Sequence, residues 1–498
     1  MKIAIIGAGL GGLTFGAFAA REGHQVHIFD KNHAPGGVVA LLEHGGYKFE
    51  QGPLLMGDML PGESLHELLK ELGIELETER ADRDIIMPDY DMIKPVDFGG
   101  KYWRRERLKA LFPEDAEGID KYYSVYDHVM HLRWLGRQPQ TPGIKIRTAL
   151  AMLKLKKYSA MNADEFTRHF FKSEKIRALF TGIFADFCAD PREVQGLGVI
   201  FMNFESAFDM RIPTEEGQHY YGGYVYFTGG CQKLPEALAA YIEQHGGTIA
   251  YGTVVEKVLV ENGTATGVRL SDGTEIRADM VVGCGAGKDF FEKCVGLEHL
   301  STQYRQILAD FRPMEAVFMV HLGVDYDPME YLRSPLTYCY GMYDLSAATE
   351  KLRNHIYHGG DDGYLIYVPS HHAPDFAPEG KHCVTLYTVC PDTLAEGDWE
   401  DVKERYADRL VALAEKHLPD LSRHTVTRRI MTAADYRAFT HMDKSSFGGV
   451  VPIWGQQNPP HKTGIKGLYF VGQQSENGGG VGAVMLGAKA AWETANNT

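Results

Sequence analysis

A glycine-rich segment near the start of the chain has the composition of a phosphate-binding turn. It reads GAGLGG over residues 7–12 and directly follows a short apolar strand predicted over Lys2–Ile6. In such a turn Gly7 permits the tight bend, and Gly9 lets the backbone approach a pyrophosphate. Gly12 lets the following helix pack closely on the strand, and the free N–H groups at the helix N-terminus attract anions. This spacing points to dinucleotide binding.

The elements around the turn fit the same interpretation. Residues Leu13–Glu22, rich in Ala, Leu and Phe, predict a helix, and Gln25–Phe29 predicts a second strand that ends at Asp30. An acidic residue at that place can accept hydrogen bonds from a ribose diol. The strand–turn–helix–strand context separates a dinucleotide-binding unit from a chance glycine-rich turn. The sequence therefore predicts a Rossmann-like unit.

The next residues carry a resemblance to a known family. After Asp30 and Lys31 come a Pro-Gly-Gly turn at residues 35–37 and the segment FEQGP at residues 49–53. With these motifs the chain resembles the flavoprotein desaturases and saturases typified by bacterial phytoene desaturase, with retinol saturase and carotenoid isomerase as relatives. In that family an Arg usually follows the glycine pair, and the second segment contains Asp. Here Val38 and Glu50 stand at those two positions.

The resemblance continues through the middle of the chain. Residues 224–230 read YVYFTGG before a predicted helix at Leu234–Gln244, similar to a Tyr-Pro-x-Gly-Gly turn of the family. The predicted strand Thr253–Val258 resembles the strand whose backbone contacts the adenine. Residues 278–287 resemble the strand that returns beside the first one. By itself that stretch could be a second nucleotide site, but no acidic partner or second βαβ unit follows it.

The C-terminal region carries the third motif. A strand predicted to end at Gly472 is followed by NGGGVGAV over residues 477–484, which opens a predicted helix at Ala483–Glu493. By resemblance, this helix start lies under the pyrimidine side of a flavin, where N–H groups and the helix dipole stabilise negative charge. The resemblance therefore implies FAD as cofactor. The FAD contacts it implies are Gly7, Gly9, Leu10, Gly11, Gly12, Asp30, Lys31, Gly36, Gly37, Val38, Gly52, Pro53, Leu54, Val255, Cys284, Gly285, Gly472, Gln473, Gly480, Val481 and Val484.

Because the three motifs lie far apart, the cofactor domain must be discontinuous. We place an FAD-binding domain at residues 1–80, 220–300 and 440–498, and a substrate domain at residues 81–219 and 301–439. The first insertion reads as mainly helical. The second mixes strands with a helix, predicted at Ala316–Leu322, Tyr364–Val368, Cys383–Val389 and Trp399–His417. The predicted fold class is α/β, a Rossmann-like FAD-binding domain with an inserted α+β substrate domain.

Composition and charge exclude several classes of protein. The 498 residues carry 51 Lys and Arg against 66 Asp and Glu, a net charge of −15, which argues against non-specific nucleic-acid binding. No apolar run approaches the roughly 20 residues that cross a bilayer. The seven cysteines are scattered, without a CxxC pair or a zinc pattern, so we expect no metal site. We expect no signal peptide and a cytoplasmic protein with reduced thiols.

One stretch departs from the acidic average. Residues 128–163 contain seven Lys or Arg and no Asp or Glu, and within them residues 144–157 read IKIRTALAMLKLKK. A basic amphipathic helix can lie in a membrane interface and admit a lipid-soluble substrate. It can equally be a solvated helix that covers the substrate domain. The sequence leaves both interpretations open.

The candidates for catalysis are weaker than those for cofactor binding, since a flavin carries the redox chemistry itself. Tyr220 and Tyr224 belong to an aromatic run that could form a wall for a conjugated substrate, although core packing explains such rings equally well. Glu476, just before the C-terminal glycine turn, is a candidate general acid or base, or simply a loop carboxylate in water.

Three functions follow from these features. The first is an FAD-dependent oxidoreductase of the phytoene desaturase type, which moves a hydride between flavin and an apolar, isoprenoid or polyene substrate. The second is an amine-oxidase-like flavoprotein on the same fold. The third is a non-catalytic prenyl- or lipid-binding protein like the Rab GDP-dissociation inhibitors, although such a protein would not need three intact cofactor segments.

Overall fold

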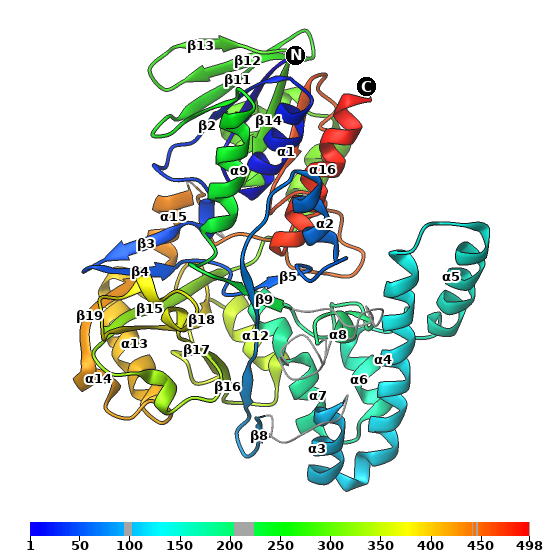
Figure 1. Ribbon diagram of the computed structural model, residues 1–498, viewed down its shortest axis with the longest axis vertical. Helices are drawn as coiled ribbons and strands as arrows, with labels where there is room; N and C mark the ends of the chain where they lie inside the picture. Colours follow the sequence, from blue (N-terminus) through cyan, green and yellow to red (C-terminus); the bar gives the residue numbers. More distant parts are fainter. Residues whose placement is uncertain (94–101, 204–223, 441, 445–446, 498) are drawn as a thin grey trace.

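A parallel sheet at one end of the molecule gathers strands from three distant parts of the sequence (Figure 1). The computed structural model describes residues 1–93, 102–203, 224–440, 442–444 and 447–497. The sheet has the order β10-β2-β1-β14-β20, and all its neighbouring strands are parallel. Its strands are β10 (Thr248–Ala250), β2 (Gln25–Phe29), β1 (Lys2–Ile6), β14 (Met280–Cys284) and β20 (Leu468–Val471). The predicted return of residues 278–287 beside the first strand is confirmed by the pairing of β1 with β14.

Helices cover this sheet and complete the Rossmann-like layer. They are α1 (Leu10–Arg21), α2 (Ser64–Glu71), α9 (Lys233–Gln244) and α16 (Val481–Asn496). Phe15 and Phe18 of α1 and Trp492 of α16 are fully buried between them, and the rings of Phe15 and Trp492 meet edge to face. Helix α1 begins at Leu10, three residues before the predicted start, because the glycine turn itself supplies the first helical residues. Both termini of the chain therefore lie in this layer.

A small antiparallel sheet and a helical segment flank the parallel sheet. The sheet consists of β11 (Val255–Glu261), β12 (Thr264–Leu270) and β13 (Glu275–Arg277), and a turn that contains Asp272 and Gly273 joins its last two strands. The helical segment contains α10 (Gly287–Asp289), a π-turn at Phe290–Val295 and α11 (Thr302–Asp310). Phe290, Phe291 and Phe470 pack together there and bury the second face of the parallel sheet.

A seven-stranded mixed sheet forms the other end of the molecule, in the order β19-β15-β18-β17-β16-β7-β8. Its strands are β19 (Thr425–Met431), β15 (Ala316–Val324), β18 (His382–Cys390), β17 (Gly363–Tyr367), β16 (Leu336–Tyr340), β7 (Asp84–Ile86) and β8 (Asp91–Met92). The strands and helix predicted in the second insertion are confirmed within a few residues. The first insertion is not purely helical, because β7 pairs in parallel with β16 and extends this sheet.

Both faces of the mixed sheet are buried, which explains the unbroken apolar run of β15. Phe318 and Val320 face α13 (Trp399–Ala414) and α14 (Leu421–His424), whereas Val317 and Met319 point to the opposite side. Alternation with period two places successive side chains on opposite faces of a strand. On the opposite side the sheet packs toward α12 (Leu345–Arg353), α15 (Ala433–Thr440) and the helices of the first insertion.

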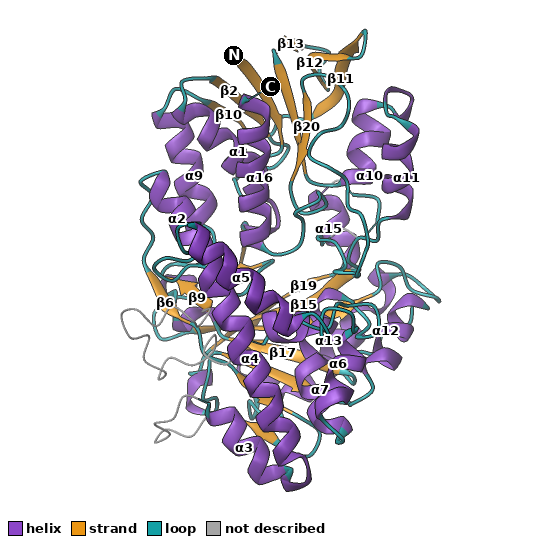
Figure 2. Cartoon of the chain, turned by 90° about the vertical axis from the view of Figure 1, so that its right-hand side faces the viewer, coloured by secondary structure: helices purple, strands orange, loops and turns teal. Residues whose placement is uncertain are grey.

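The helices of the first insertion form a separate layer beside that face (Figure 2). They are α3 (Trp103–Leu111), α4 (Ala116–Gly136), α5 (Pro142–Leu155), α6 (Ala163–Phe170), α7 (Glu174–Thr181) and α8 (Gly198–Phe201). Tyr122, Phe166 and Phe180 are packed at its centre. Where α4 crosses α6, a β-carbon at Gly118 would lie 1.9 Å from the Phe170 carbonyl oxygen, so only glycine allows this crossing.

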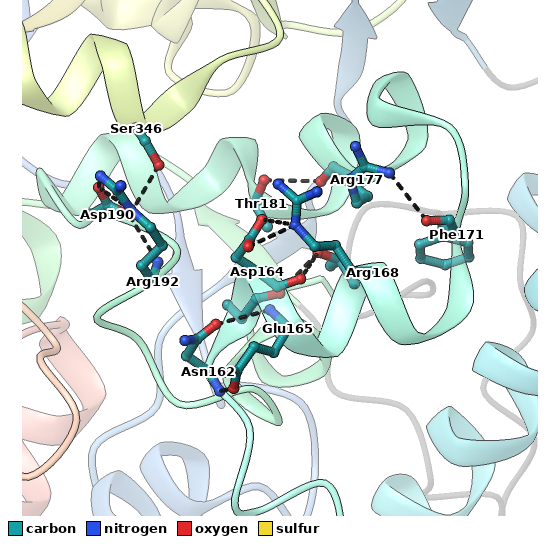
Figure 3. A network of polar contacts seen from close by, with 12 residues as sticks. Asn162, Asp164, Glu165, Arg168, Phe171, Arg177, Thr181, Asp190, Arg192 and Ser346 are labelled. Carbon is teal, nitrogen blue, oxygen red and sulfur yellow. Dashed lines mark hydrogen bonds and ion pairs between the residues drawn. The ribbon is translucent and has the colours of Figure 1, made fainter.

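Polar contacts fix the start of α6 and the loop between α7 and α8 (Figure 3). The Asn162 side chain caps α6 by accepting from the Glu165 N–H, and the Glu165 carboxylate accepts from the Asn162 N–H. Asp190 forms an ion pair with Arg192 and accepts a hydrogen bond from Ser346 of α12. These bonds hold residues 188–197 between the helical layer and the mixed sheet.

Two short antiparallel sheets connect the ends of the molecule. One is the hairpin of β3 (Leu41–His44) and β4 (Tyr47–Glu50), and the other has the order β5-β9-β6, from Met56–Gly57, Tyr224–Phe227 and Thr78–Arg80. Among the residues that the structure describes, no helix combines the length and apolar character needed to cross a membrane.

Candidate functional site

A single large cavity of about 1170 Å³ runs from the parallel sheet to the mixed sheet and the helical layer. At one end it is lined by the carboxyl ends of β1, β2, β14 and β20 and by the start of α16. In open α/β sheets ligands bind outside these strand ends, at the point where the strand order reverses. Here that point is β1, which lies between β2 and β14.

Close backbone contacts shape this end of the cavity. A β-carbon at Gly11 would lie 2.9 Å from the Gly472 Cα, and one at Gly7 would lie 2.9 Å from the Cys284 carbonyl oxygen. At Gly12 a β-carbon would lie 2.2 Å from the Gly7 carbonyl oxygen, and the Gly12 N–H donates to the Cys284 Sγ at 3.2 Å. Only glycines let the three segments approach so closely. The result is an open cradle bounded by backbone N–H groups.

Asp30 lies in this cradle and is held by backbone donors. Its Oδ2 accepts from the Ala8 N–H at 2.6 Å, and its Oδ1 accepts from the Asn32 N–H at 2.7 Å. Burial raises the pKa of Asp30, whereas these two bonds and the charge of Lys31 favour the carboxylate. Burial also lowers the pKa of Lys31 to about 8, and its Nζ donates to the Ala438 carbonyl oxygen at 2.9 Å.

The opposite wall of the cradle is the glycine turn that opens α16. Gly480 is the N-cap of the helix, and no side chain caps it, so the first N–H groups of α16 are available to a ligand. Asp58 lies beside this helix start, 3.7 Å from the position of a β-carbon at Gly482. Arg133 of α4 forms an ion pair with Asp58, and both residues line the cavity. The positive end of a helix dipole and a buried guanidinium therefore meet at one place.

The cavity brings together the residues singled out in the sequence. All the cofactor contacts implied by the resemblance line it except Gly12, whose backbone is packed against the turn. Tyr224 also lines the cavity. Tyr220 lies outside the described residues. Glu476 does not line the cavity: it is exposed and accepts from the His461 N–H at 2.8 Å, as expected for a loop carboxylate.

The other end of the cavity is an apolar chamber whose residues the sequence did not reveal. It is bounded by the segment after α7, by the loop before α8, and by the inner face of the mixed sheet. Its walls include Ile183, Phe184, Phe187, Val194, Phe201, Met202, Met314, Tyr338, Leu365 and Tyr387. These residues belong to no motif, and each is ordinary for a protein core. They become a site only because the two insertions face each other.

Comparison with known proteins gives the family. A family model described as flavin containing amine oxidoreductase matches residues 10–494. The chain belongs to this family. It is 26% identical to a prolycopene isomerase of Daucus carota over 505 residues, which cover 96% of this chain and 77% of that protein. It is also 26% identical to a lycopene-forming phytoene desaturase of a Paracoccus species, over 98% of this chain and 95% of that one.

The solved structures agree on the fold of this flavin-containing oxidoreductase. An oxidoreductase from Methanosarcina mazei, 19% identical, superposes with a TM-score of 0.62 over 99% of this chain and 100% of that one. The expected α/β class, with a parallel sheet and a separate mixed sheet, is thereby confirmed. The resemblance to the phytoene desaturases and carotenoid isomerases, read from three motifs, is confirmed by the full-length relatives.

The residues present in the cavity fit a flavin dinucleotide. Gly7, Gly11 and Gly472 let three backbone segments meet without a side chain between them, and Asp30 lines the cavity beside them. Helices α1 and α16 both begin at the cradle, and no side chain caps either helix, so each presents the positive end of its dipole there. The cations Lys31 and Arg133 line the same space. Together these donors suit an anionic ligand with a polar ring system.

A buried carboxylate joins the cradle to the mixed sheet. Glu50, only 2% exposed, accepts from the Cys231 N–H at 2.7 Å through Oε1 and from the Tyr367 hydroxyl at 2.7 Å through Oε2. The Cys231 Sγ in turn lies 3.4 Å from the Pro53 carbonyl oxygen. One side chain thus fixes the cavity wall at Pro53, the Gly-Gly turn before α9, and β17.

We predict that Glu50→Ala strongly destabilises the fold. The substitution leaves two buried donors without acceptors, and each unsatisfied group costs about 1–3 kcal/mol. The free energy of unfolding, measured by urea titration with tryptophan fluorescence, should fall by at least about 2 kcal/mol. Glu43→Ala is the matched control, because Glu43 is exposed on the same hairpin and should change stability by less than about 0.5 kcal/mol. Equal effects of the two substitutions would contradict the assignment.

Proposed function

We propose that the protein is an FAD-dependent oxidoreductase of the phytoene desaturase type that acts on an elongated apolar substrate, an isoprenoid or polyene. This proposal rests on the observation that the cradle and the apolar chamber form one continuous cavity. A pocket for one small ligand usually has about 300–1,000 Å³, and this cavity of about 1170 Å³ exceeds that range. It has room for a dinucleotide in the cradle and for part of a second, apolar molecule in the chamber.

The division of the chain belongs to the same proposal. Residues 1–80, 220–300 and 440–498 would hold the cofactor, and residues 81–219 and 301–439 would enclose the substrate. The parallel sheet takes its strands from the first three ranges, and the mixed sheet takes its strands from the other two. This arrangement supports the proposal, because the cavity lies between the two sets.

In this proposal, each part of the cradle contacts a different part of FAD. Asp30 would accept hydrogen bonds from the adenosine ribose, and the N–H groups at the start of α1 would bind the pyrophosphate. The start of α16 and Arg133 would stabilise negative charge on the flavin ring. FAD, when bound, supplies a two-electron hydride acceptor or donor. The protein chain would hold FAD in a fixed orientation and exclude water from the site.

The chamber favours a polyene over the two other candidates. Its walls are aliphatic and aromatic, which suits a long apolar chain. The relatives named prolycopene isomerase and phytoene desaturase support the same substrate class. An amine-oxidase-like enzyme would release peroxide with amines. A non-catalytic prenyl-binding protein would not need the cradle, whose glycines and Asp30 are all in place.

Asp30→Ala should weaken FAD binding by about 10- to 100-fold, because hydrogen bonds to a charged acceptor contribute about 1.5–3 kcal/mol. Titration of the apoprotein with FAD, followed by the quenching of flavin fluorescence, measures the affinity. Asp272→Ala on the exposed β12–β13 hairpin removes the same charge away from the cavity and should leave the affinity unchanged. A purified wild-type protein that is colourless and does not take up FAD would favour the prenyl-binding alternative.

Polyene turnover tests the reaction itself. The FAD-loaded protein, mixed anaerobically with phytoene or prolycopene in detergent micelles, should change the absorption spectrum of the polyene or bleach the flavin. A panel of primary amines should release no peroxide in air. Peroxide release with amines, together with unchanged polyene spectra, would replace this proposal by the amine-oxidase-like one.

We also propose that α5 contacts a membrane from which the substrate enters. In Figure 1 α5 lies on the outer side of α4, at the edge of the molecule, and in Figure 2, where this side faces the viewer, it lies in front of α4. Ile146, Leu150 and Leu153 follow each other at helical spacing and are 62%, 57% and 65% exposed. Arg147 and Lys154 flank this stripe on one side, and Lys145 and Lys156 on the other. An apolar stripe between cations fits an anionic bilayer surface.

The position of α5 relative to the cavity supports the entry of the substrate from a membrane. Ser159, just after α5, accepts at its carbonyl oxygen from the Gln195 side chain at 3.2 Å. Gln195 also forms an isolated β-bridge with Asn162 and lines the cavity. Phe201, a lining residue of the same region, is 43% exposed. These contacts place the end of α5 next to a wall of the cavity.

Replacing Ile146, Leu150 and Leu153 together by Ser should reduce binding to anionic vesicles at least tenfold. The reason is that full burial of one such aliphatic side chain in the bilayer contributes about 1.5–3 kcal/mol to the binding free energy. Co-sedimentation with phosphatidylglycerol vesicles measures the bound fraction. The double substitution Ile356→Ser and Val426→Ser removes two other exposed apolar side chains and should change nothing. Wild-type protein that stays in the supernatant would show that α5 is a solvated helix.

A further inference from the structure

A carboxyl group in the wall of the apolar chamber has no role in holding the cofactor. Asp186 lines the cavity in the 3-10 helix Gly182–Phe187, beside Ile183 and Phe184. An acidic side chain facing an apolar ligand needs an explanation, since taking a carboxylate out of water is expensive. A wall built only to fit a polyene would have an apolar residue there.

Groups from several elements face Asp186. Arg83, just before β7, and Tyr338 of β16 both lower the pKa of Asp186, the first through its positive charge and the second through a hydrogen bond. The Arg83 guanidinium lies over the Tyr338 ring, with the Cζ 4.9 Å from the centroid. The other titratable neighbours are Cys188, Tyr340 and Tyr387. Asp186 therefore lies at the boundary between this polar group and the apolar chamber.

In the described part of the chain, each of the other acidic residues that line the cavity has a hydrogen-bond donor or a cation that stabilises its carboxylate. Asp30 accepts two backbone N–H groups, and Asp58 pairs with Arg133. The remaining pairs are Glu256 with Arg269 at 3.4 Å and Asp289 with Lys293 at 2.6 Å. Asp186 differs from them because its neighbours along the cavity wall are apolar.

The environment of Asp186 suits proton transfer. Burial raises its pKa to about 7, although Arg83 and the hydrogen bond from Tyr338 act in the opposite direction. A carboxyl group with a pKa near the ambient pH is present in both protonation states, which is the condition for efficient general acid–base catalysis.

We propose that Asp186 is the proton-transferring catalytic residue, which exchanges a proton with a carbon atom of the substrate in the chamber. This inference rests on the proposed function. Removing two hydrogens from neighbouring carbons takes away one hydride and one proton. The hydride leaves with its electron pair to the oxidised flavin. The proton of the adjacent carbon goes to the Asp186 carboxylate, and the electron pair of that C–H bond becomes the new π bond. Saturation follows the same steps in reverse, with the protonated Asp186 as donor.

The test compares pH profiles of the FAD-loaded enzyme. With phytoene as substrate, the rate of dehydrogenation should rise with pH through a midpoint near 7, because the carboxylate is the active form. Asp186→Asn should lower this rate at least 100-fold, within the range of about 10²–10⁴ for a lost acid–base group, and should abolish the midpoint. Its FAD affinity, measured by fluorescence titration, should equal that of the wild type. Asp186→Glu should restore part of the rate and the pH dependence.

Tyr338→Phe provides a second variant that keeps the carboxyl group. Losing the Tyr338 hydrogen bond removes an influence that lowers the pKa of Asp186, so the midpoint should move to higher pH while the alkaline plateau is retained. A structural role of Tyr338 would change the plateau and leave the midpoint in place. An Asp186→Asn enzyme with the wild-type rate and profile overturns the role of Asp186 alone. A wild type that binds FAD and isomerises prolycopene without dehydrogenating phytoene overturns the role of Asp186 and leaves the proposed function standing. A wild type that binds FAD and converts neither polyene overturns both.

Discussion

The site depends on one constraint: three backbone segments must approach one another with no side chain between them. The turn after β1, the end of β14 and the turn after β20 meet at Gly7, Gly11, Cys284 and Gly472. Each β-carbon added at these glycines would enter the backbone of another segment. Because the parallel sheet takes these strands from the two ends and the middle of the chain, the cradle can form only when the whole sheet has formed. Binding of a cofactor there would therefore stabilise the complete fold.

A second set of buried polar contacts couples the cradle to the mixed sheet. Besides the bonds of Glu50, the Tyr436 hydroxyl of α15 donates to the Gln51 carbonyl oxygen at 2.6 Å. Tyr226 of β9 stacks on His372, with ring centroids 3.8 Å apart, and on Tyr367 at 6.0 Å. Polar groups that are buried and fully hydrogen-bonded specify one arrangement of their elements, because any shift leaves them unsatisfied. The relative position of cradle and chamber is thus set by side chains next to the cavity.

The sequence predicts the two parts of the site unequally. Much of the lining of the cradle could be predicted from the sequence, because Gly11, Asp30 and the turn before α16 belong to motifs whose residue types are set by local backbone geometry. The chamber was not, because Phe187, Leu365 and Tyr387 carry no spacing rule and acquire a function only from tertiary packing. The same reason explains why β7 was missed: three residues between loops give no periodicity, and only pairing with β16 makes them a strand. Glu476 illustrates the reverse error, since its proximity to a motif in sequence does not bring it to the cavity.

Two aspartates that line the cavity show how environment divides chemical roles between identical side chains. Burial raises the pKa of both Asp30 and Asp186. At Asp30 two backbone N–H groups hold the carboxylate oxygens, and these donors do not titrate. The Asp30 carboxylate is therefore suited to bind a ligand and not to transfer protons. At Asp186 the partners are a tyrosine hydroxyl and a guanidinium, and the open side faces apolar walls. A carboxyl group there can take up a proton without breaking a backbone contact. When two titratable groups of the same type lie in environments that differ in this way, the difference indicates which of them can act as an acid or base. The cavity therefore contains, at its two ends, one aspartate that fits a binding role and one that fits proton transfer.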